Sequence, residues 1–359
     1  MSGRFRVVDT GVRDGRFNIA VDQAMIELHQ AGRIPDTIRF IQVPPTALVG
    51  RHQVLGREVD LAWCGREGVG VARRITGGGA IYMDEGQLGW ALVFHRRTLG
   101  LAALGDVAQA VCETVAAGLA RLGIDARYRP RNDIEIDGRK ISGTGGFFDG
   151  DTLIYQGTVL VDMDPAAMVA ALRVPRAKLE KRQLDSAAQR VVTLRELLGP
   201  KTPGLPAIQQ ALLEAFAERF DVEWSDESLG AEEESLAWRR HAEEIGTEAF
   251  VGEIDDPARD GDFAAGQHVC PGGSITTYLR LEGPARLRVG QLLITGDFFV
   301  APPRVVLDLE AALRGAYVED IGPIIEQFFR EHTVEALSVT PADFRSSIEE
   351  SVAAAARGA

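Results

Sequence analysis

The chain has 359 residues, more than one ordinary hydrophobic core accommodates, so its length predicts a large domain with a smaller one attached. Apolar residues make up 45% and charged residues 25%, which excludes a disordered or fibrous chain. The formal charge of -13 opposes general binding to nucleic acid. No apolar run approaches the roughly 20 residues that a membrane span requires.

The N-terminal segment and the cysteines indicate the compartment. The segment MSGRFRVVDT lacks the apolar centre of a secretion signal. Cys64, Cys112 and Cys270 lie far apart with no paired spacing, which argues against a disulfide framework and against a structural zinc site. We therefore expect a cytoplasmic protein that contacts neither membrane nor nucleic acid and offers no metal site of its own side chains.

Hydrophobic periodicity predicts helices and strands that alternate along the first 220 residues. Apolar side chains at helical spacing, or in short β-branched runs, give helices over 19–28, 107–122, 165–174 and 207–220, and strands over 37–43, 68–75, 88–94 and 153–162. Residues 134–141 form a hairpin pattern around Asp137-Gly138, a pair suited to a tight turn. This order predicts an α+β fold, with a mixed β-sheet flanked by helices.

The pattern changes after a segment rich in Asp, Gly and Pro at 253–266. Two strands over 274–282 and 286–295 are followed by a helix over 305–315, and the last helix begins with Thr340 as cap and Pro341 at its first position. We expect a catalytic domain at 1–255, a linker at 256–265 and a small α/β accessory domain at 266–359. Its two strands and three helices predict an appendage too small to house the main chemistry.

The first motif is ARRITGGGAIYMD at 72–84. Three consecutive glycines, Gly77, Gly78 and Gly79, let backbone N–H groups approach a phosphate or carboxylate closely. Arg73 and Arg74 just before them carry charge that can bind phosphate oxygens. By itself the pattern fits a flexible turn with a surface arginine pair equally well.

The second motif is NDIEIDGRKISGTG at 132–145. In a two-residue hairpin Lys140 lies across from Glu135, so one interpretation is a solvent-facing lysine paired with that glutamate. The other is a lysine held over a site, where it neutralises a phosphate and a carboxylate that react with each other. Small residues and hydroxyls directly after Lys140 would let a nucleotide lie close.

In this order the two motifs, followed by Gly-Thr-Val-Leu, resemble the lipoate–protein ligase family. Supporting similarity to that family lies at 17–25, 44–53, 178–194 and 296–299. The resemblance implies a biotin/lipoyl ligase-like fold, related to class II synthetases, with a fused accessory domain. It also implies ATP and lipoate as substrates, Mg²⁺ as cofactor and a lipoyl-acceptor protein domain as partner.

The resemblance assigns a role to each matched residue. Lys140 would be the catalytic residue, in contact with the acyl carbonyl and the phosphate. The ATP and lipoyl-adenylate site would be made by Arg74, Gly77, Gly78, Gly79, Ala80, Ile81, Tyr82, Asp84, Asn132, Asp133, Lys140, Ser142, Gly143, Thr144, Gly157 and Thr158. The implied reaction forms lipoyl-adenylate and then an amide on an acceptor lysine.

Two alternatives to a ligase stay open, a binding protein without catalysis and an acyl transferase. Met83-Asp84 stands where the family has His-Asp, which leaves room for a non-catalytic lipoyl-adenylate-binding protein. An octanoyl or lipoyl transferase from an acyl-carrier protein needs a cysteine, yet the approach to the lysine hairpin, RYRPRND, contains none. Cys112 falls in an amphipathic helix and is expected to be a core thiol.

Overall fold

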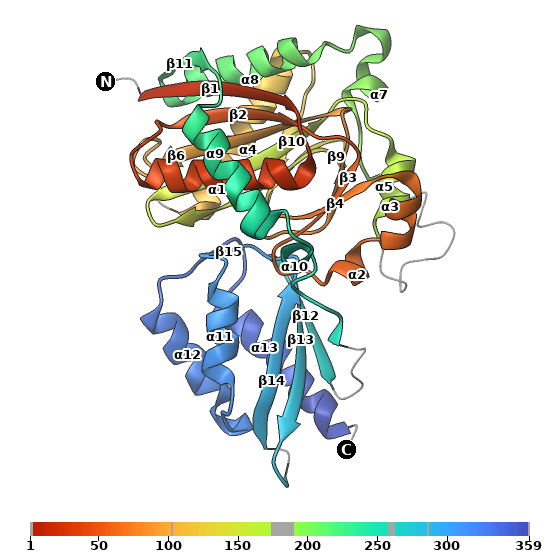
Figure 1. Cartoon of the computed structure of the whole chain (residues 1–359), viewed down its shortest axis with the longest axis vertical. Coiled ribbons are helices and arrows are strands. Elements are labelled where there is room, and N and C mark those ends of the chain that lie inside the picture. The colour runs from red at the N-terminus through yellow and green to blue at the C-terminus, as the bar shows by residue number, and fades with distance from the viewer. Residues whose placement is uncertain (1–2, 102, 174–189, 258–262, 286, 358–359) are drawn as a thin grey trace.

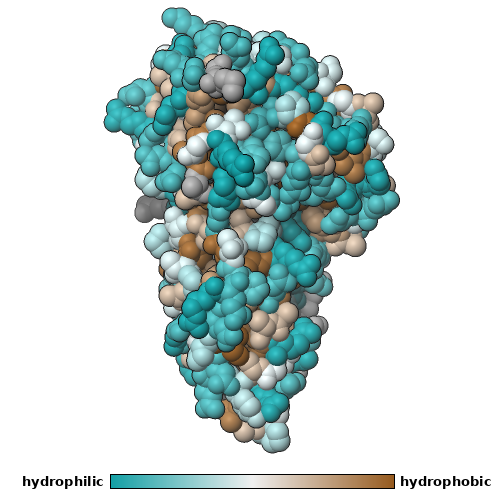
Figure 2. Space-filling model, turned by 90° about the vertical axis from the view of Figure 1, so that its left-hand side faces the viewer, coloured by the Kyte–Doolittle hydropathy of each residue, from teal (hydrophilic) through white to brown (hydrophobic). Residues whose placement is uncertain are grey.

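The structure is a computed structural model that describes residues 3–101, 103–173, 190–257, 263–285 and 287–357. Part of the family-like segment 178–194 therefore lies outside the described residues. The described residues up to 257 form a larger, wide part, and those from 263 onward form a smaller part attached at one end of it (Figure 1). The first is called here the N-terminal half and the second the C-terminal, or accessory, half. Hydrophilic side chains prevail on the face shown in Figure 2, over both halves.

The N-terminal half is built on a mixed β-sheet. The strand order is β11-β1-β2-β6-β10-β9-β8-β7; β1 pairs in parallel with β11 and β2, and the remaining pairs are antiparallel. The strands are β1 Gly3–Val12, β2 Thr37–Gln42, β6 Gln87–His95, β7 Arg127–Arg129, β8 Asp133–Ile136, β9 Arg139–Asp149, β10 Thr152–Leu160 and β11 Val222–Glu227. The expected mixed sheet is confirmed.

Helices cover both faces of this sheet. On one face α1 packs against α9, and on the other α4 packs against α8 (Figure 1). The helices of this half are α1 Gly15–Gln30, α2 Leu55–Glu58, α3 Leu61–Glu67, α4 Leu104–Arg121, α5 Pro165–Ala171, α7 Leu194–Leu198, α8 Leu205–Phe220, α9 Ala231–Arg240 and α10 Glu248–Val251. The apolar stripe predicted over 107–122 is the buried side of α4.

A second, three-stranded sheet stands beside the α1 face. Its central strand β3 (Thr46–Val49) pairs in parallel with β4 (Gly70–Arg73) and antiparallel with β5 (Ile81–Met83). The segment that joins β4 to β5 contains the three glycines, so this small sheet holds both ends of the glycine loop, defined here as residues 76–80. The loop is therefore fixed opposite the main sheet.

The C-terminal half has its own core. A three-stranded antiparallel sheet, β12-β13-β14, packs against α13. The elements are β12 Ala264–Cys270, β13 Gly273–Glu282, β14 Arg288–Gly296, β15 Val300–Ala301, α11 Val305–Leu313, α12 Ile321–Glu331, β16 Glu335–Ala336 and α13 Pro341–Arg357. The three helices agree with the sequence prediction. The prediction of only two strands was wrong: it missed the two-residue strands β15 and β16, and it missed β12, whose sequence AAGQHVC has one large aliphatic residue, Val269, and that residue is exposed.

The two halves meet at the glycine loop. The Gly78 amide donates to the Phe298 carbonyl oxygen at 3.2 Å, and the Gly296 amide donates to the His52 carbonyl oxygen at 2.9 Å. The buried His52 ring stacks on Phe298 with centroids 5.1 Å apart. A Cβ at Gly77 would collide with the Phe298 carbonyl group, so only glycine permits this close approach.

Glu58 and Asp297 lie near each other at this junction, and their carboxyls make the stability depend on pH. Burial and the nearby Asp297 raise the pKa of Glu58 to about 7, against the opposing charge of Arg57. An unfolded glutamate titrates near 4.3, so the folded state binds more protons between the two values and stability falls as pH rises toward 7. We expect Glu58→Gln to raise the Tm by roughly 2 °C at pH 8 and to leave it unchanged at pH 4.5.

Thermal unfolding of both proteins at the two pH values tests this expectation. An equal Tm difference at pH 4.5 and at pH 8 would show that the ionisation of Glu58 is not the cause.

No helix within the described ranges is long and apolar enough to cross a membrane. This agrees with the absence of a long apolar run in the sequence.

Candidate functional site

A cavity of about 360 Å³ lies between α1, the glycine loop and the sheet face that α1 covers. Most of the residues that the family resemblance singled out line it: Arg74, Gly77, Gly78, Gly79, Ala80, Ile81, Tyr82, Asn132, Asp133, Lys140, Gly143, Thr144, Gly157 and Thr158. Two motifs about 60 residues apart in sequence therefore meet in one cavity.

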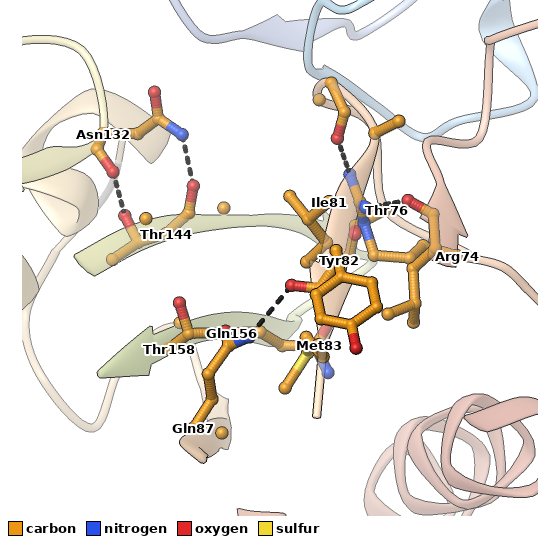
Figure 3. Close-up of a pocket in the computed structure, with 18 of the residues that line it drawn as sticks. Arg74, Thr76, Ile81, Tyr82, Met83, Gln87, Asn132, Thr144, Gln156 and Thr158 are labelled. Atoms are coloured by element: carbon orange, nitrogen blue, oxygen red, sulfur yellow. Dashed lines mark hydrogen bonds between the residues drawn. The ribbon is translucent and has the colours of Figure 1, made fainter. Parts of the chain in front are cut away.

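Arg74 stabilises the glycine loop by hydrogen bonds to its backbone. Its guanidinium donates to the carbonyl oxygens of Leu48 at 3.0 Å, Gly77 at 3.0 Å and Gly79 at 2.8 Å (Figure 3). Burial lowers the pKa of Arg74 to about 10, which leaves the guanidinium charged at neutral pH. Arg74 therefore sets the shape of the loop and gives it a positive charge.

Arg73 has a structural role in the fold. Its side chain is fully buried and donates to the carbonyl oxygens of Gly50, Arg51, Gln53, Phe250 and Val251. The expectation that both arginines bring charge to a phosphate is thus wrong for Arg73. Adjacent residues of a strand point to opposite sides, and only Arg74 faces the cavity.

Lys140 lies on the cavity floor. The register places it opposite Glu135, as the hairpin pattern predicted, but its ammonium pairs with the Asp133 carboxylate at 2.7 Å. Glu135 pairs instead with Arg129 at 3.3 Å. The interpretation of a solvent-facing lysine paired with Glu135 is therefore wrong, because a bulge in this hairpin turns the lysine toward the cavity.

Gly143 makes the room for that lysine. A Cβ at Gly143 would collide with the end of the Lys140 side chain, so the ammonium lies directly over the glycine. Burial opposes ionisation of Asp133, yet Lys140 and Arg129 outweigh it and lower the pKa of Asp133 below its ordinary value. An ionised Asp133 carboxylate thus lies beside the Lys140 ammonium at the cavity wall.

Thr144 points its hydroxyl away from the cavity. The hydroxyl donates to the Asn132 carbonyl oxygen at 2.9 Å, and lies 2.7 Å from the Tyr155 hydroxyl and 3.3 Å from the Cys112 sulfur. The Asn132 amide returns a hydrogen bond to the Thr144 carbonyl (Figure 3). Thr144 therefore lines the cavity through its backbone and fixes β9 to the segment before β8.

We expect Thr144→Val to lower the free energy of unfolding by about 1–3 kcal/mol, because it leaves the buried Tyr155 hydroxyl without this partner. Thr114→Val is the matched control, since the buried Thr114 hydroxyl bonds only the helical carbonyl of Ala110. Denaturant unfolding measures both. Equal losses in the two variants would contradict the role given to the Thr144 network.

Gly157 and Thr158 lie on β10 with opposite orientations. A Cβ at Gly157 would collide with the Trp90 indole, which belongs to the core on the α4 face. Thr158 points to the α1 face and the cavity (Figure 3). Gly157 therefore contributes backbone to the cavity wall, and Thr158 contributes a side chain.

Asp84 and Ser142 lie outside the cavity lining. The Asp84 carboxylate accepts from the amides of Gly86 at 2.9 Å and Asp164 at 3.4 Å, so it stabilises a turn. Ser142 is fully buried. Met83, which stands where the family has histidine, is buried and adds an apolar side chain to the cavity.

Several lining residues escaped the sequence analysis. They are polar residues of α1 and β10 or residues that the accessory half supplies, and they include Asn18, Asp22, Gln156, Asp297 and Phe299. Asp22 is buried, pairs with Arg39 at 2.7 Å and accepts from Gln156 at 2.6 Å. The one available signal was the position of Asp22 in α1, three residues after Ile19 and four before Ile26, which puts an acidic side chain on the apolar face of the helix.

The three cysteines, all of which the structure describes, lie outside the cavity lining. Cys112 comes nearest, through Thr144, but burial raises the pKa of its thiol to about 12. A buried thiol with that pKa is not a nucleophile at neutral pH, so the expectation of a core thiol is confirmed.

Comparison with known proteins agrees with this arrangement. Residues 14–217 match the family model of the lipoyl protein ligase A/B catalytic domain. The chain is 28% identical over 257 residues to octanoyltransferase LipM of Kyrpidia tusciae, covering 65% of this chain and 93% of that one. It is 28% identical over 260 residues to lipoate-protein ligase A subunit 1 of Thermoplasma acidophilum, covering 70% and 96%.

A solved structure supports the same assignment. A crystal structure of lipoate-protein ligase A bound with ATP superposes with a TM-score of 0.62 at 26% identity, covering 71% of this chain and 100% of that one. The matched family model spans more than half of the chain. The chain therefore belongs to the lipoyl protein ligase A/B family of enzymes, within the biotin/lipoate ligase superfamily.

Proposed function

We propose that this protein is an ATP-dependent lipoate–protein ligase. In the first step a lipoate carboxylate oxygen attacks the α-phosphorus of ATP, and pyrophosphate leaves. In the second step the ε-amine of an acceptor lysine attacks the acyl carbonyl carbon, the bond to the phosphate oxygen breaks, and AMP leaves. The product is an amide on the acceptor protein.

The position of Lys140 carries this proposal. Two negatively charged reactants must approach each other in the first step, and a fixed ammonium between them lowers that repulsion. Lys140 lies on the cavity floor over Gly143, beside Asp133, which holds its ammonium in place. The Arg74 charge lies behind the glycine loop in the same cavity.

The cavity has an apolar part that suits an acyl chain. Its wall there is made by Ile19, Ile41, Val43, Leu48 and Met83. An aliphatic acid would place its chain against these side chains and its carboxylate toward Lys140. The cavity thus suits lipoate, which has an apolar chain and a charged carboxylate. The similarity to a ligase bound with ATP supports a nucleotide as the other substrate.

Mg²⁺ would enter with the nucleotide. Within the described part of the chain no cluster of three or more His, Cys, Asp or Glu side chains could hold a metal ion. Mg²⁺ at phosphates needs only one or two protein carboxylates, so Asp133 and Asp297, both at the cavity, suffice as oxygen donors. The ion would offset phosphate charge.

Intact-mass analysis tests the proposed function. A small lipoyl-acceptor domain is incubated with this protein, lipoate, Mg²⁺ and ATP, and in parallel without ATP. We expect a gain of one lipoyl group that requires ATP. Absence of both this gain and of pyrophosphate release would contradict the proposal.

Octanoyl transfer is the second candidate, because the similarity to octanoyltransferase LipM extends over 93% of that relative. The buried state of Cys112 and the absence of a cysteine from the cavity lining argue against it. Incubation with octanoyl-acyl-carrier protein and the acceptor in place of lipoate and ATP separates the two. Acyl gain in that mixture would replace the ligase by a transferase.

A further inference from the structure

The accessory half supplies two residues to the cavity lining, Asp297 and Phe299, and only Phe299 brings an aromatic ring. Phe299 lies between β14 and β15 and lines the cavity, although only 5% of it is exposed. It belongs to the main core of the N-terminal half rather than to the core of its own half. Its backbone carbonyl oxygen accepts from the Leu337 amide at 3.1 Å, which holds the segment from behind.

The Phe299 ring fills the gap between two glycines that face each other. A Cβ at Gly78 of the glycine loop would collide with the outer edge of this ring, and so would a Cβ at Gly145 of β9. The ring therefore closes the space between the loop and the sheet where neither wall has a side chain.

This closure lies beside the catalytic lysine. Gly145, under the ring, and Gly143, under the Lys140 ammonium, are two residues apart on one strand and on the same face. Such positions are about 7 Å apart. The apolar edge of Phe299 therefore borders the place where the acyl-adenylate linkage would form.

We propose that Phe299 is a positioning residue that shields the acyl-adenylate from water. This inference rests on the proposed ligase function. Water can take the place of the acceptor amine: its oxygen attacks the acyl carbonyl carbon, the bond to the phosphate oxygen breaks, and AMP leaves with the free acid. An apolar ring that closes the gap beside Lys140 removes the path along which that water would arrive.

The experiment measures the decay of enzyme-bound lipoyl-adenylate. The full-length protein is mixed with lipoate, Mg²⁺ and a limiting amount of labelled ATP, without acceptor, and adenylate and AMP are separated in quenched samples. We expect Phe299→Ala to speed the decay about tenfold, which is about 1.4 kcal/mol of barrier. Phe299→Leu, which keeps most of the apolar bulk, should decay close to the wild-type rate.

Phe329→Ala is the matched control. Phe329 is a partly buried phenylalanine of the accessory half that packs against Phe344 and lies outside the cavity lining. Its replacement should leave the decay unchanged, although it loosens the same half. Tm values confirm that each variant is folded.

The outcomes separate the two proposals. Wild-type decay in folded Phe299→Ala would overturn the shielding role and leave the ligase function intact. Absence of adenylate in Phe299→Ala alone would also overturn it, because the ring would then serve binding. Absence of adenylate in the wild-type protein would overturn the ligase function, and the shielding role with it.

Discussion

Replacing Lys140 by alanine is expected to slow lipoyl-adenylate formation by about 10²–10³-fold while the protein stays folded. The ammonium lines the cavity beside Asp133, and under the proposed function it is the charge that draws the carboxylate and the α-phosphate together. The side chain is 35% exposed, so its ion pair with Asp133 contributes little to stability. Pyrophosphate release in the presence of lipoate measures the effect.

Arg139→Ala is the matched control for this prediction. Arg139 precedes Lys140 in the same hairpin, but its guanidinium pairs with the exposed Glu196 and lies outside the cavity lining. Its replacement should leave pyrophosphate release at the wild-type rate. A folded Lys140→Ala protein with wild-type release would remove Lys140 from the mechanism.

Gly143→Ala should slow the same step by about 100-fold without removing any charged group. The added Cβ would occupy the place of the Lys140 ammonium and force it off the cavity floor. The side chain that must move is flexible at its end, so we expect the Tm to change little. Pyrophosphate release and thermal unfolding together distinguish displacement of the lysine from damage to the fold.

Two further variants sharpen this test. Gly105→Ala adds a methyl group where nothing lies within 4 Å, so it should have no effect on the rate. If Gly143 acts through Lys140, the double variant Lys140→Ala, Gly143→Ala should be no slower than Lys140→Ala alone. Independent, multiplying losses would show that the glycine has another role.

The ligase and the transferase alternatives need different groups at the cavity. A transferase needs a thiolate that the acyl group can reach, whereas Cys112 is buried with a pKa of about 12. A ligase instead needs a cation beside a cavity that accepts a nucleotide and an acyl chain. Lys140 and the glycine loop meet that need, which is why we favour ligation.

The order of most elements and the turn of the Lys140 hairpin could be predicted from the amino-acid sequence. Hydrophobic periodicity predicted α4, because burial of one face leaves its period in the chain, and a continuous apolar run predicted β6, which is buried on both faces. Asp137-Gly138 predicted the turn because both residues adopt positive φ angles, 50° and 78°, which few other pairs tolerate. Family resemblance then assigned most of the residues that line the cavity.

The directions in which those side chains point depend on contacts between distant segments and could not be predicted. A bulge puts Lys140 on the same face as Gly143, where its ammonium pairs with Asp133, and strand alternation directs the Thr144 hydroxyl into the core. Local sequence does not encode a bulge or the neighbours across a sheet. The contribution of Phe299 also depends on how two separate cores dock, a long-range contact that leaves no periodic signal in the chain.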